Sequence, residues 1–295
     1  MRGKRSQSAM EYLMTYGWAI LIIAVVLGAL FQLGVFNAGT FAPRAPPGAC
    51  QVFRPNGPGS TQFINLEGVC NGELPQYVAY FNGYASISVD PLADAPQGNA
   101  HHSVFFWIDP QFIGSSSYVY ETQLGGCTSS GGYYNQSVLT LSGNSNGGTL
   151  GFDGCYNNGG SGLQVNLNTW IFVGYTWNGV TLDEYANTNN HTMNLNAETI
   201  YPARFTFQFS TGCCSGGGNF KGYVANLQIY NYTVTPKEVN ALYLEGVGGA
   251  PIRLQRLVAW WPLNGNANDY SGNNNNGVPN GVTYTNQWAS GYTPP

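Results

Sequence analysis

The feature that most constrains the fold is a series of short apolar and aromatic runs that fills the chain from residue 76 to its end. Each run is rich in Val, Ile, Phe, Tyr or Trp and is bounded by Gly, Asn, Pro or Ser. Such runs are typical of β-strands separated by tight turns. The runs occupy residues 77–81, 86–89, 103–108, 118–124, 138–141, 162–165, 170–177, 180–186, 204–209, 222–230, 257–261 and 281–285. We therefore predict a mainly β fold, a jelly-roll sandwich.

Two local patterns add detail to this prediction. Asn178-Gly179 separates two of the runs and is a strong signal for a β-hairpin. One short soluble helix is predicted after the run at 222–230, because Thr235 can cap it, Pro236 suits its first position and Glu238 completes a capping box.

The composition excludes one class of partner. Charged residues make up only 8% of the chain, against about 25% in an average domain. The net charge is -4, and Lys and Arg do not cluster beyond the first five positions. Nucleic-acid binding needs clustered Lys and Arg, so we predict no nucleic-acid partner. A surface rich in Gly, Asn and Tyr suits an extracellular β-domain.

The cysteines point to the same compartment. All six follow the N-terminal apolar stretch, and an even number of cysteines favours disulfides in an oxidising exterior. Cys50 and Cys70 flank a turn within residues 39–75, where we expect a linker and a small disulfide-clipped hairpin. The remaining pairings stay open, because spacing does not determine connectivity. The disulfide candidates are Cys50, Cys70, Cys127, Cys155, Cys213 and Cys214.

The N-terminus carries a long apolar stretch, residues 19–36, behind the basic residues Arg2, Lys4 and Arg5. As a helix this stretch would span ~27 Å, close to the hydrocarbon core of a bilayer. We therefore predict that the N-terminal helix contacts membrane lipid and anchors the protein in the membrane. Because basic flanks stay in the cytoplasm, the bulk of the chain is expected outside.

Glu11 lies at the start of this helix, where a charge is costly unless it is paired. Cleavage between Ser6 and Gln7 would make Glu11 the fifth residue of the mature chain and would create a new α-amino group at Gln7. The ammonium group of one subunit can then neutralise Glu11 of a neighbour when helices pack side by side. This pattern predicts leader cleavage at Ser6 and Gln7 and assembly through Glu11.

The segment RSQSAMEYLMTYGWAILII resembles the class III signal peptide of archaeal-type IV pilins, although Ser6 stands where Gly or Ala is more usual. The resemblance covers residues 2–38. It implies a leader at residues 1–6 that a prepilin peptidase removes, and a hydrophobic helix at residues 7–38 that binds like subunits in a cell-surface filament. The alternative is a membrane-anchored, carbohydrate-binding surface protein that does not polymerise.

Four segments in the β-rich part, taken in order, resemble the laminin G-like domains of the concanavalin A-like superfamily. They begin at Phe81 (FNGYASISV), Ser103 (SVFFWIDP), Thr169 (TWIFVGYTWNG) and Gly222 (GYVANLQIYNYTVTPKEVNALY). The resemblance implies a lectin-like sandwich over residues 76–295. Such a domain would serve adhesion to glycans or would coat a filament.

The segment VAWWPLNGNANDYSGN, which begins at Val258, resembles the strand that normally opens this domain, yet here it follows the closing helix. Three arrangements are open: the domain is circularly permuted and the segment folds back, a second domain begins here, or the strand pairs with a neighbouring subunit. We favour permutation, because a truncated second sandwich could not bury its apolar face.

Candidate catalytic residues are absent from the sequence pattern. Glycoside hydrolases with this fold need two carboxylates that flank one bond, and no alternating acidic triplet on one strand face occurs. We therefore predict that the protein is not an enzyme. Asp269 and Asn273 lie in an Asn- and Gly-rich loop and offer oxygen ligands for calcium. The alternative for Asp269 is a residue that caps its own turn.

Exposed aromatic side chains are the candidates for glycan binding. Tyr133, Tyr134, Tyr156 and Trp288 lie in Gly- and Asn-rich loops, where they could stack on a sugar ring. A tyrosine-rich surface without a ligand is the alternative. The tryptophans inside strands are predicted to belong to the core; these are Trp107, Trp170, Trp177, Trp260 and Trp261.

Overall fold

The computed structural model describes most of the β-rich part of the chain and one N-terminal helix. The described residues are 5–32, 75–89, 92–96, 100–114, 117–122, 137–144, 146–154, 158–194, 205–208, 218–293 and 295. The chain divides into two units; helix α1 belongs to the first, and every described strand belongs to the second.

Helix α1 runs from Arg5 to Gln32. Where its side chains are described they are exposed, and Trp18 and Ile22 keep 64% and 57% of their surface in contact with solvent. Crossing a bilayer takes about 20 consecutive apolar residues in one helix. Within the part of the chain that the structure describes, no helix meets that requirement. This finding corrects the prediction that the N-terminal helix anchors the protein in a membrane.

The second unit contains two eight-stranded sheets. The first sheet has the order β10-β9-β8-β3-β13-β1-β16, and β14 also pairs with β13. The strands of the first sheet are β10 (Asn189–Asn194), β9 (Thr181–Ala186), β8 (Ile171–Trp177), β3 (His102–Phe112), β13 (Lys221–Tyr230), β1 (Val78–Asn82), β16 (Thr283–Thr285) and β14 (Leu257–Trp261).

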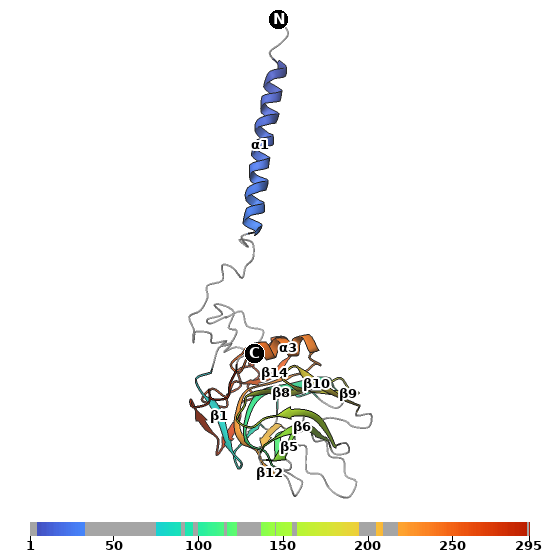
Figure 1. Ribbon diagram of the computed structural model, residues 1–295, viewed down its shortest axis with the longest axis vertical. Helices are drawn as coiled ribbons and strands as arrows, with labels where there is room; N and C mark the ends of the chain where they lie inside the picture. Colours follow the sequence, from blue (N-terminus) through green and yellow to red (C-terminus); the bar gives the residue numbers. More distant parts are fainter. Residues whose placement is uncertain are drawn as a thin grey trace. The chain divides into compact units, whose positions relative to one another are not determined.

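The second sheet has the order β15-β2-β11-β4-β5-β6-β7, and β12 pairs with β4. Its strands are β15 (Val278–Asn280), β2 (Ser86–Val89), β11 (Phe205–Gln208), β4 (Ser117–Thr122), β5 (Ser137–Asn144), β6 (Gly147–Gly154), β7 (Asn158–Val165) and β12 (Gly218–Asn219). Figure 1 shows the two sheets as stacked layers. The prediction of a mainly β sandwich is confirmed.

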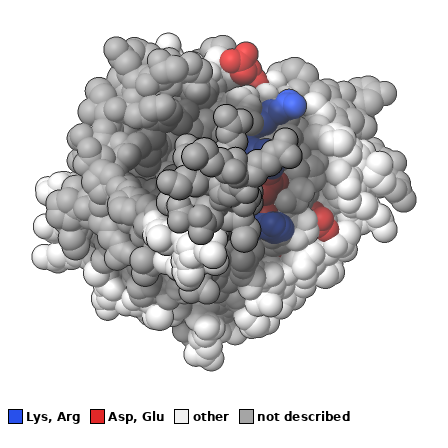
Figure 2. Space-filling model, turned by 90° about the horizontal axis from the view of Figure 1, so that it is seen from above, with Lys and Arg blue, Asp and Glu red and all other residues white. Residues whose placement is uncertain are grey.

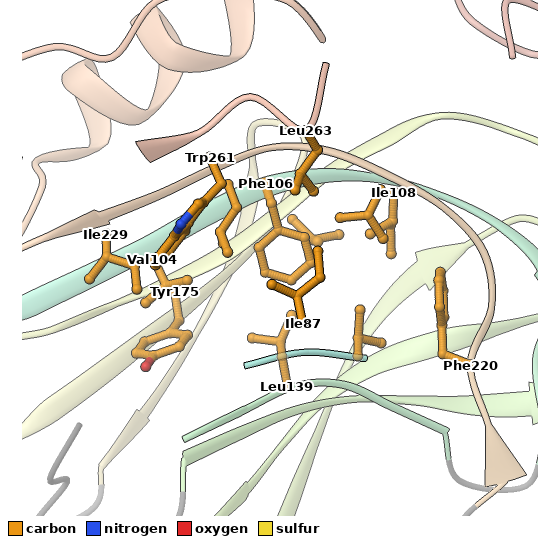
Figure 3. Close-up of a cluster of buried hydrophobic side chains, with 14 of the residues drawn as sticks. Ile87, Val104, Phe106, Ile108, Leu139, Tyr175, Phe220, Ile229, Trp261 and Leu263 are labelled. Carbon is orange, nitrogen blue, oxygen red and sulfur yellow. The ribbon is translucent and has the colours of Figure 1, made fainter. Parts of the chain in front are cut away.

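The main core lies between the two sheets. Alternate residues of a strand point to opposite faces, so one face of each sheet supplies this core. Phe106 and Ile108 of the first sheet point toward Ile87 and Leu139 of the second (Figure 3), and all four are at most 3% exposed. Burial of this apolar surface is the main force that holds the sheets together.

A second core lies on the outer face of the first sheet, the face that points away from the second sheet. Aromatic residues of this face pack against helix α3, Pro236–Leu244, and against the C-terminal tail, residues 286–293. The Trp107 ring stacks on Tyr243 of α3 at 5.8 Å and meets Tyr292 of the tail at 5.9 Å between ring centroids. Helix α3 lies on this side of the sandwich in Figure 1.

The two local patterns read from the sequence are confirmed. Helix α3 begins after Thr235, whose side chain accepts a hydrogen bond from the Glu238 backbone N–H while the Glu238 carboxylate reaches back to the cap. Strands β8 and β9 form an antiparallel hairpin at Asn178-Gly179. Gly179 has a φ of 90°, a conformation that suits glycine.

The C-terminal segment folds back into the same sandwich. Strand β14 pairs with β13 and β16 pairs with β1 in the first sheet, whereas β15 pairs with β2 in the second. Of the three arrangements considered, the strand pairing shows the one in which the segment folds back. The segment completes both layers instead of starting a new domain.

Candidate functional site

An open groove of about 470 Å³ lies on the outer face of the first sheet. We call it the tyrosine groove. It is lined by Tyr80, Gln111, Lys221, Tyr223, Thr283 and Thr285. The groove therefore combines two aromatic rings with amide, hydroxyl and ammonium groups, a mixture that suits a polar organic ligand.

Strand register brings these residues together from four separate parts of the chain. Tyr80 of β1 lies opposite Tyr223 of β13 on one side and opposite Thr283 of β16 on the other. Tyr223 in turn lies opposite Asp109 of β3. Gln111 of β3 lines the same groove at the point where the register between β3 and β13 shifts.

Tyr80 and Tyr223 form the aromatic part of the groove. Their ring centroids are 5.2 Å apart and the rings are tilted by 48°. The Tyr223 ring also stacks on Trp170 at 6.4 Å, at the margin of the outer core. Both tyrosines are half-buried, so each ring is fixed by its neighbours while part of it stays open to the groove.

Asp109 lies next to the groove and is only 2% exposed. Its Oδ1 atom has no hydrogen-bond partner. Burial raises the pKa of Asp109 to about 6, and hydrogen bonds from the Gln111 side chain and the Thr169 backbone oppose that shift. Burial also raises the pKa of Tyr223, with smaller contributions from Tyr80 and Asp109. The Tyr223 hydroxyl is therefore neutral at physiological pH.

A second buried carboxyl group lies in the main core. Glu184 of β9 has no exposed surface, and neither carboxylate oxygen has a hydrogen-bond partner. Burial raises the pKa of Glu184 to about 8, opposed by the Ser161 side chain. Glu184 stands two residues from Leu182 and from Ala186 on β9, so it points into the main core as they do. Asp109 lies on the outer face of the sheet. These two carboxyl groups cannot flank one glycosidic bond, because the first sheet separates them.

Asp269 and Asn273 have structural roles in the loop after β14. The Asp269 Oδ1 atom accepts hydrogen bonds from the backbone N–H groups of Trp260 and Ser271, at 2.9 and 2.8 Å. Its Oδ2 atom accepts from the Ser271 hydroxyl and the Asn275 N–H, at 2.8 and 2.9 Å. Asn273 donates through Nδ2 to the carbonyls of Leu257 and Val258, both at 2.9 Å.

This bonding leaves little room for calcium at Asp269. Its lone pairs already accept four protein donors, and the Asn273 amide is held by its own hydrogen bonds to Leu257 and Val258. The described residues contain no group of three or more His, Cys, Asp or Glu side chains that could hold a metal ion. The geometry matches the alternative in which Asp269 caps its own turn.

The other predicted site residues have mixed outcomes. Tyr133, Tyr134, Tyr156 and all the cysteines lie outside the described residues. Trp288 does not stack on a ligand surface, because it is 3% exposed and its carbonyl accepts a hydrogen bond from Trp170 Nε1 at 3.0 Å. The strand tryptophans are all core residues, as predicted. Ser6, Gln7 and Glu11 fall within α1, and their side chains are not described.

The groove residues were missed by the sequence reasoning. A signal was present: Tyr80 stands between the buried residues Ala79 and Phe81, so it points away from the main core. Tyr223 likewise precedes the buried Val224. The sequence pattern does not show whether another segment of the chain covers these rings on the outer face.

Comparisons with known proteins agree with this architecture. Residues 81–240 match the family described as the concanavalin A-like lectin/glucanases superfamily. No curated protein matches the sequence.

The solved structures that share the fold include two that match more than two thirds of this chain. One is a proposed carbohydrate-binding protein from Bacteroides ovatus, with a TM-score of 0.56 and 14% identity over 77% of this chain. The match covers 66% of that protein's chain. The other is a heptameric SAP-like pentraxin from Limulus polyphemus, with a TM-score of 0.50, 16% identity, and coverage of 71% of this chain and 94% of that one.

Proposed function

Because this chain belongs to the concanavalin A-like lectin/glucanases superfamily, we propose that it is a carbohydrate-binding protein whose ligand occupies the tyrosine groove. The observation that carries the proposal is the pair of half-buried tyrosines, 5.2 Å apart, that opens into a groove lined by Gln111 and two threonines. The carbohydrate-binding description of the Bacteroides ovatus protein with the same fold is in keeping with it.

The chemistry of the groove fits a sugar. One face of a sugar ring carries C–H groups, which pack on an aromatic ring, while its hydroxyl groups need hydrogen-bond partners. Tyr80 and Tyr223 supply the rings. Gln111, Thr283 and Thr285 supply donors and acceptors around them. Because the tyrosines are held by neighbouring side chains, little conformational entropy is lost when a ligand binds.

We infer binding without cleavage. Glycoside hydrolysis needs two carboxyl groups on either side of one bond. Asp109 is the acidic residue that the strand register places next to the groove, and Glu184 lies on the other side of the first sheet. A bound glycan should therefore be recovered intact after prolonged incubation, as chromatography of the glycan would show.

A glycan array with site variants tests the proposal. Tyr223→Ala and Tyr80→Ala should each weaken binding about tenfold, the equivalent of ~1.4 kcal/mol. Tyr84→Ala is the matched control, because Tyr84 is 81% exposed and does not line the groove. Equal binding by all three variants, or the absence of any bound glycan, would overturn the assignment of the groove. A parallel array with a chelator shows whether binding needs calcium.

A second candidate function concerns α1. Its exposed apolar side chains, among them Trp18, Ile22 and Val26, gain from burial when helices of like subunits pack side by side. In this reading the chain is a type IV pilin-like subunit with a class III signal peptide, and a prepilin peptidase cuts between Ser6 and Gln7. The sandwich would then be displayed along a filament as its coat or adhesin.

Two measurements test this second function. N-terminal sequencing of the mature protein should give Gln7 as the first residue, and a start after residue 36 would end the pilin reading. Glu11→Gln should abolish filaments seen by electron microscopy, because the amine at Gln7 loses its partner, whereas Glu245→Gln in the sandwich should not. Normal filaments from Glu11→Gln would contradict the role of that carboxylate.

A further inference from the structure

We propose that the tyrosine groove selects acidic glycans, and that Lys221 is the residue that determines this specificity by pairing with a carboxylate or sulfate group of the sugar. This inference rests on the proposed carbohydrate-binding function and names the chemical class of its ligand. It departs from the general expectation for a protein with a net charge of -4, which repels anions at long range.

Lys221 is one of the residues that line the groove. Lys221 begins β13, lies opposite Asn82 of β1 and Phe112 of β3, and is exposed where it lines the groove. Tyr223 stands two residues further along the strand and therefore on the same face. A ligand that packs on the tyrosine rings is thus within reach of a long, flexible ammonium side chain.

Lys221 is the charged residue among the six that line the groove. The other five lining residues are Tyr, Gln and Thr, which carry no charge at neutral pH. Within the described chain, Lys221 forms no ion pair, whereas Arg253 pairs with Glu238 at 2.7 Å. Among the described residues drawn in Figure 2, the blue and red side chains form one small group and the others are white. An unpaired cation beside two aromatic rings is therefore a distinctive feature of this protein.

The neighbouring acid offsets this charge only where its carboxyl group is ionised. Asp109 is buried beside the groove. Tyr223 and Lys221 lie on the neighbouring strand β13, and Tyr80 lies on the next strand, β1. Burial keeps the Asp109 carboxyl protonated up to about pH 6, the value of its pKa. Below that pH the groove carries the Lys221 charge alone, so acidic glycans should bind more tightly there than at pH 8.

The ammonium group and the neutral side chains bind different parts of the ligand. Lys221 has three N–H donors, which match the acceptor oxygens of a carboxylate or a sulfate. The tyrosine rings and the Gln111, Thr283 and Thr285 side chains can hold the sugar ring itself. Selectivity then comes from the anion and baseline affinity from the ring, so the two contributions can be measured separately.

The test compares matched pairs of ligands by isothermal titration calorimetry. Trigalacturonate is paired with its methyl ester, and a sulfated disaccharide is paired with its unsulfated form; an array provides further uronate and sulfate pairs. The wild-type protein should bind the acidic member of at least one pair about tenfold more tightly, since a hydrogen bond to a charged group is worth that much. Raising the salt concentration should reduce the difference, because exposed charges are screened.

Three variants test whether Lys221 causes the preference for acidic ligands. Lys221→Gln should remove the preference for the acidic ligand and leave binding of the neutral ligand unchanged, and Lys221→Arg should keep most of the preference. Lys237→Gln is the control, because Lys237 is an exposed lysine on α3 outside the groove. Circular dichroism confirms that each variant is folded.

The outcomes separate this inference from the proposed function. Equal binding of acidic and neutral ligands across all pairs would overturn the role of Lys221 while leaving a carbohydrate-binding protein. A preference that persists in Lys221→Gln would overturn it as well. If no glycan binds at all, then the carbohydrate-binding function itself fails.

Discussion

The outer face of the first sheet has two halves that contrast sharply. In one half, Trp107 and Phe172 are at most 2% exposed beneath α3 and the C-terminal tail. In the other half, Tyr80 and Tyr223 stay half-exposed and line the tyrosine groove. Strand β13 contributes an aromatic ring to each half, Tyr230 to the buried cluster and Tyr223 to the groove. The difference between a core and a binding surface is therefore made by the segments that lie above the sheet.

Specific hydrogen bonds hold the covering segments in place. The Trp170 N–H donates to the Gly291 carbonyl at 3.2 Å, and the Val247 N–H donates to the Tyr292 hydroxyl at 3.2 Å. Asn226, at the bulge of β13, donates to the Gly249 carbonyl at 2.9 Å and accepts from Trp260 Nε1 at 2.8 Å. Trp170, which takes part in the first of these bonds, also stacks on Tyr223, where the covered half meets the open half.

The largest effect should come from removing a ring in the covered half. Trp107→Ala should lower the free energy of unfolding by about 4 kcal/mol, because it leaves a large cavity between β3, α3 and the tail. Tyr80→Ala, in the open half, should cost less than about 1 kcal/mol, because that ring is already in partial contact with water. Urea denaturation measures both. Similar losses would mean that the two halves do not differ in packing.

Removing a covering residue should have the next largest effect. Trp288→Ala should cost about 3 kcal/mol, because the Trp288 ring packs edge-on against Trp170 at 5.7 Å and against Tyr292 at 5.9 Å. The loosened tail should also expose apolar surface next to the groove, which a rise in ANS fluorescence would detect. Thr293→Ala, a change at an exposed residue of the same tail, should leave stability and fluorescence unchanged.

The smallest of the three effects should depend on pH. The folded pKa of Asp109, about 6, is raised above its usual value of 3.8 by burial. The unfolded chain therefore releases this proton more readily, and Asp109 reduces stability progressively as the pH rises from about 4 to 6. Asp109→Asn should be more stable than the wild type by about 2 kcal/mol at pH 8 and no more stable at pH 3.5.

Urea denaturation of both proteins across this pH range checks the Asp109 prediction. Taking the difference between variant and wild type at each pH removes the contributions of all other titrating groups. A constant difference would show that Asp109 keeps its usual pKa in the folded protein.

Several parts of the fold followed from the sequence, and others did not. The predicted runs correspond to strands. The N-terminal cap of α3 was predicted correctly from Thr235 and Glu238, because capping depends on local contacts. Strands β6, with the sequence GGTLGFDG, and β10, with NNHTMN, were missed. Their Gly and Asn residues resemble turns, and pairing with neighbouring strands overrides that local preference.

The site shows the same division between local and tertiary information. Loop aromatics such as Trp288 were predicted to bind sugars, yet Trp288 is buried and the groove is built by strand tyrosines. The Asp269 loop offered the right atoms for calcium, but three backbone N–H groups and the Ser271 hydroxyl donate to the Asp269 oxygens. In both cases the residue type was visible in the sequence and its surroundings were not.

By itself, the sequence determined the β-sandwich, the position of its one cap-defined helix, and the alternation that turns Tyr80 and Tyr223 away from the main core. Tertiary structure alone decided where the C-terminal segment lies and which part of the outer face it covers. The physical reason is the separation along the chain over which each effect acts. Strand alternation and capping involve a few neighbouring residues, whereas burial of an aromatic ring depends on segments that are distant in the chain.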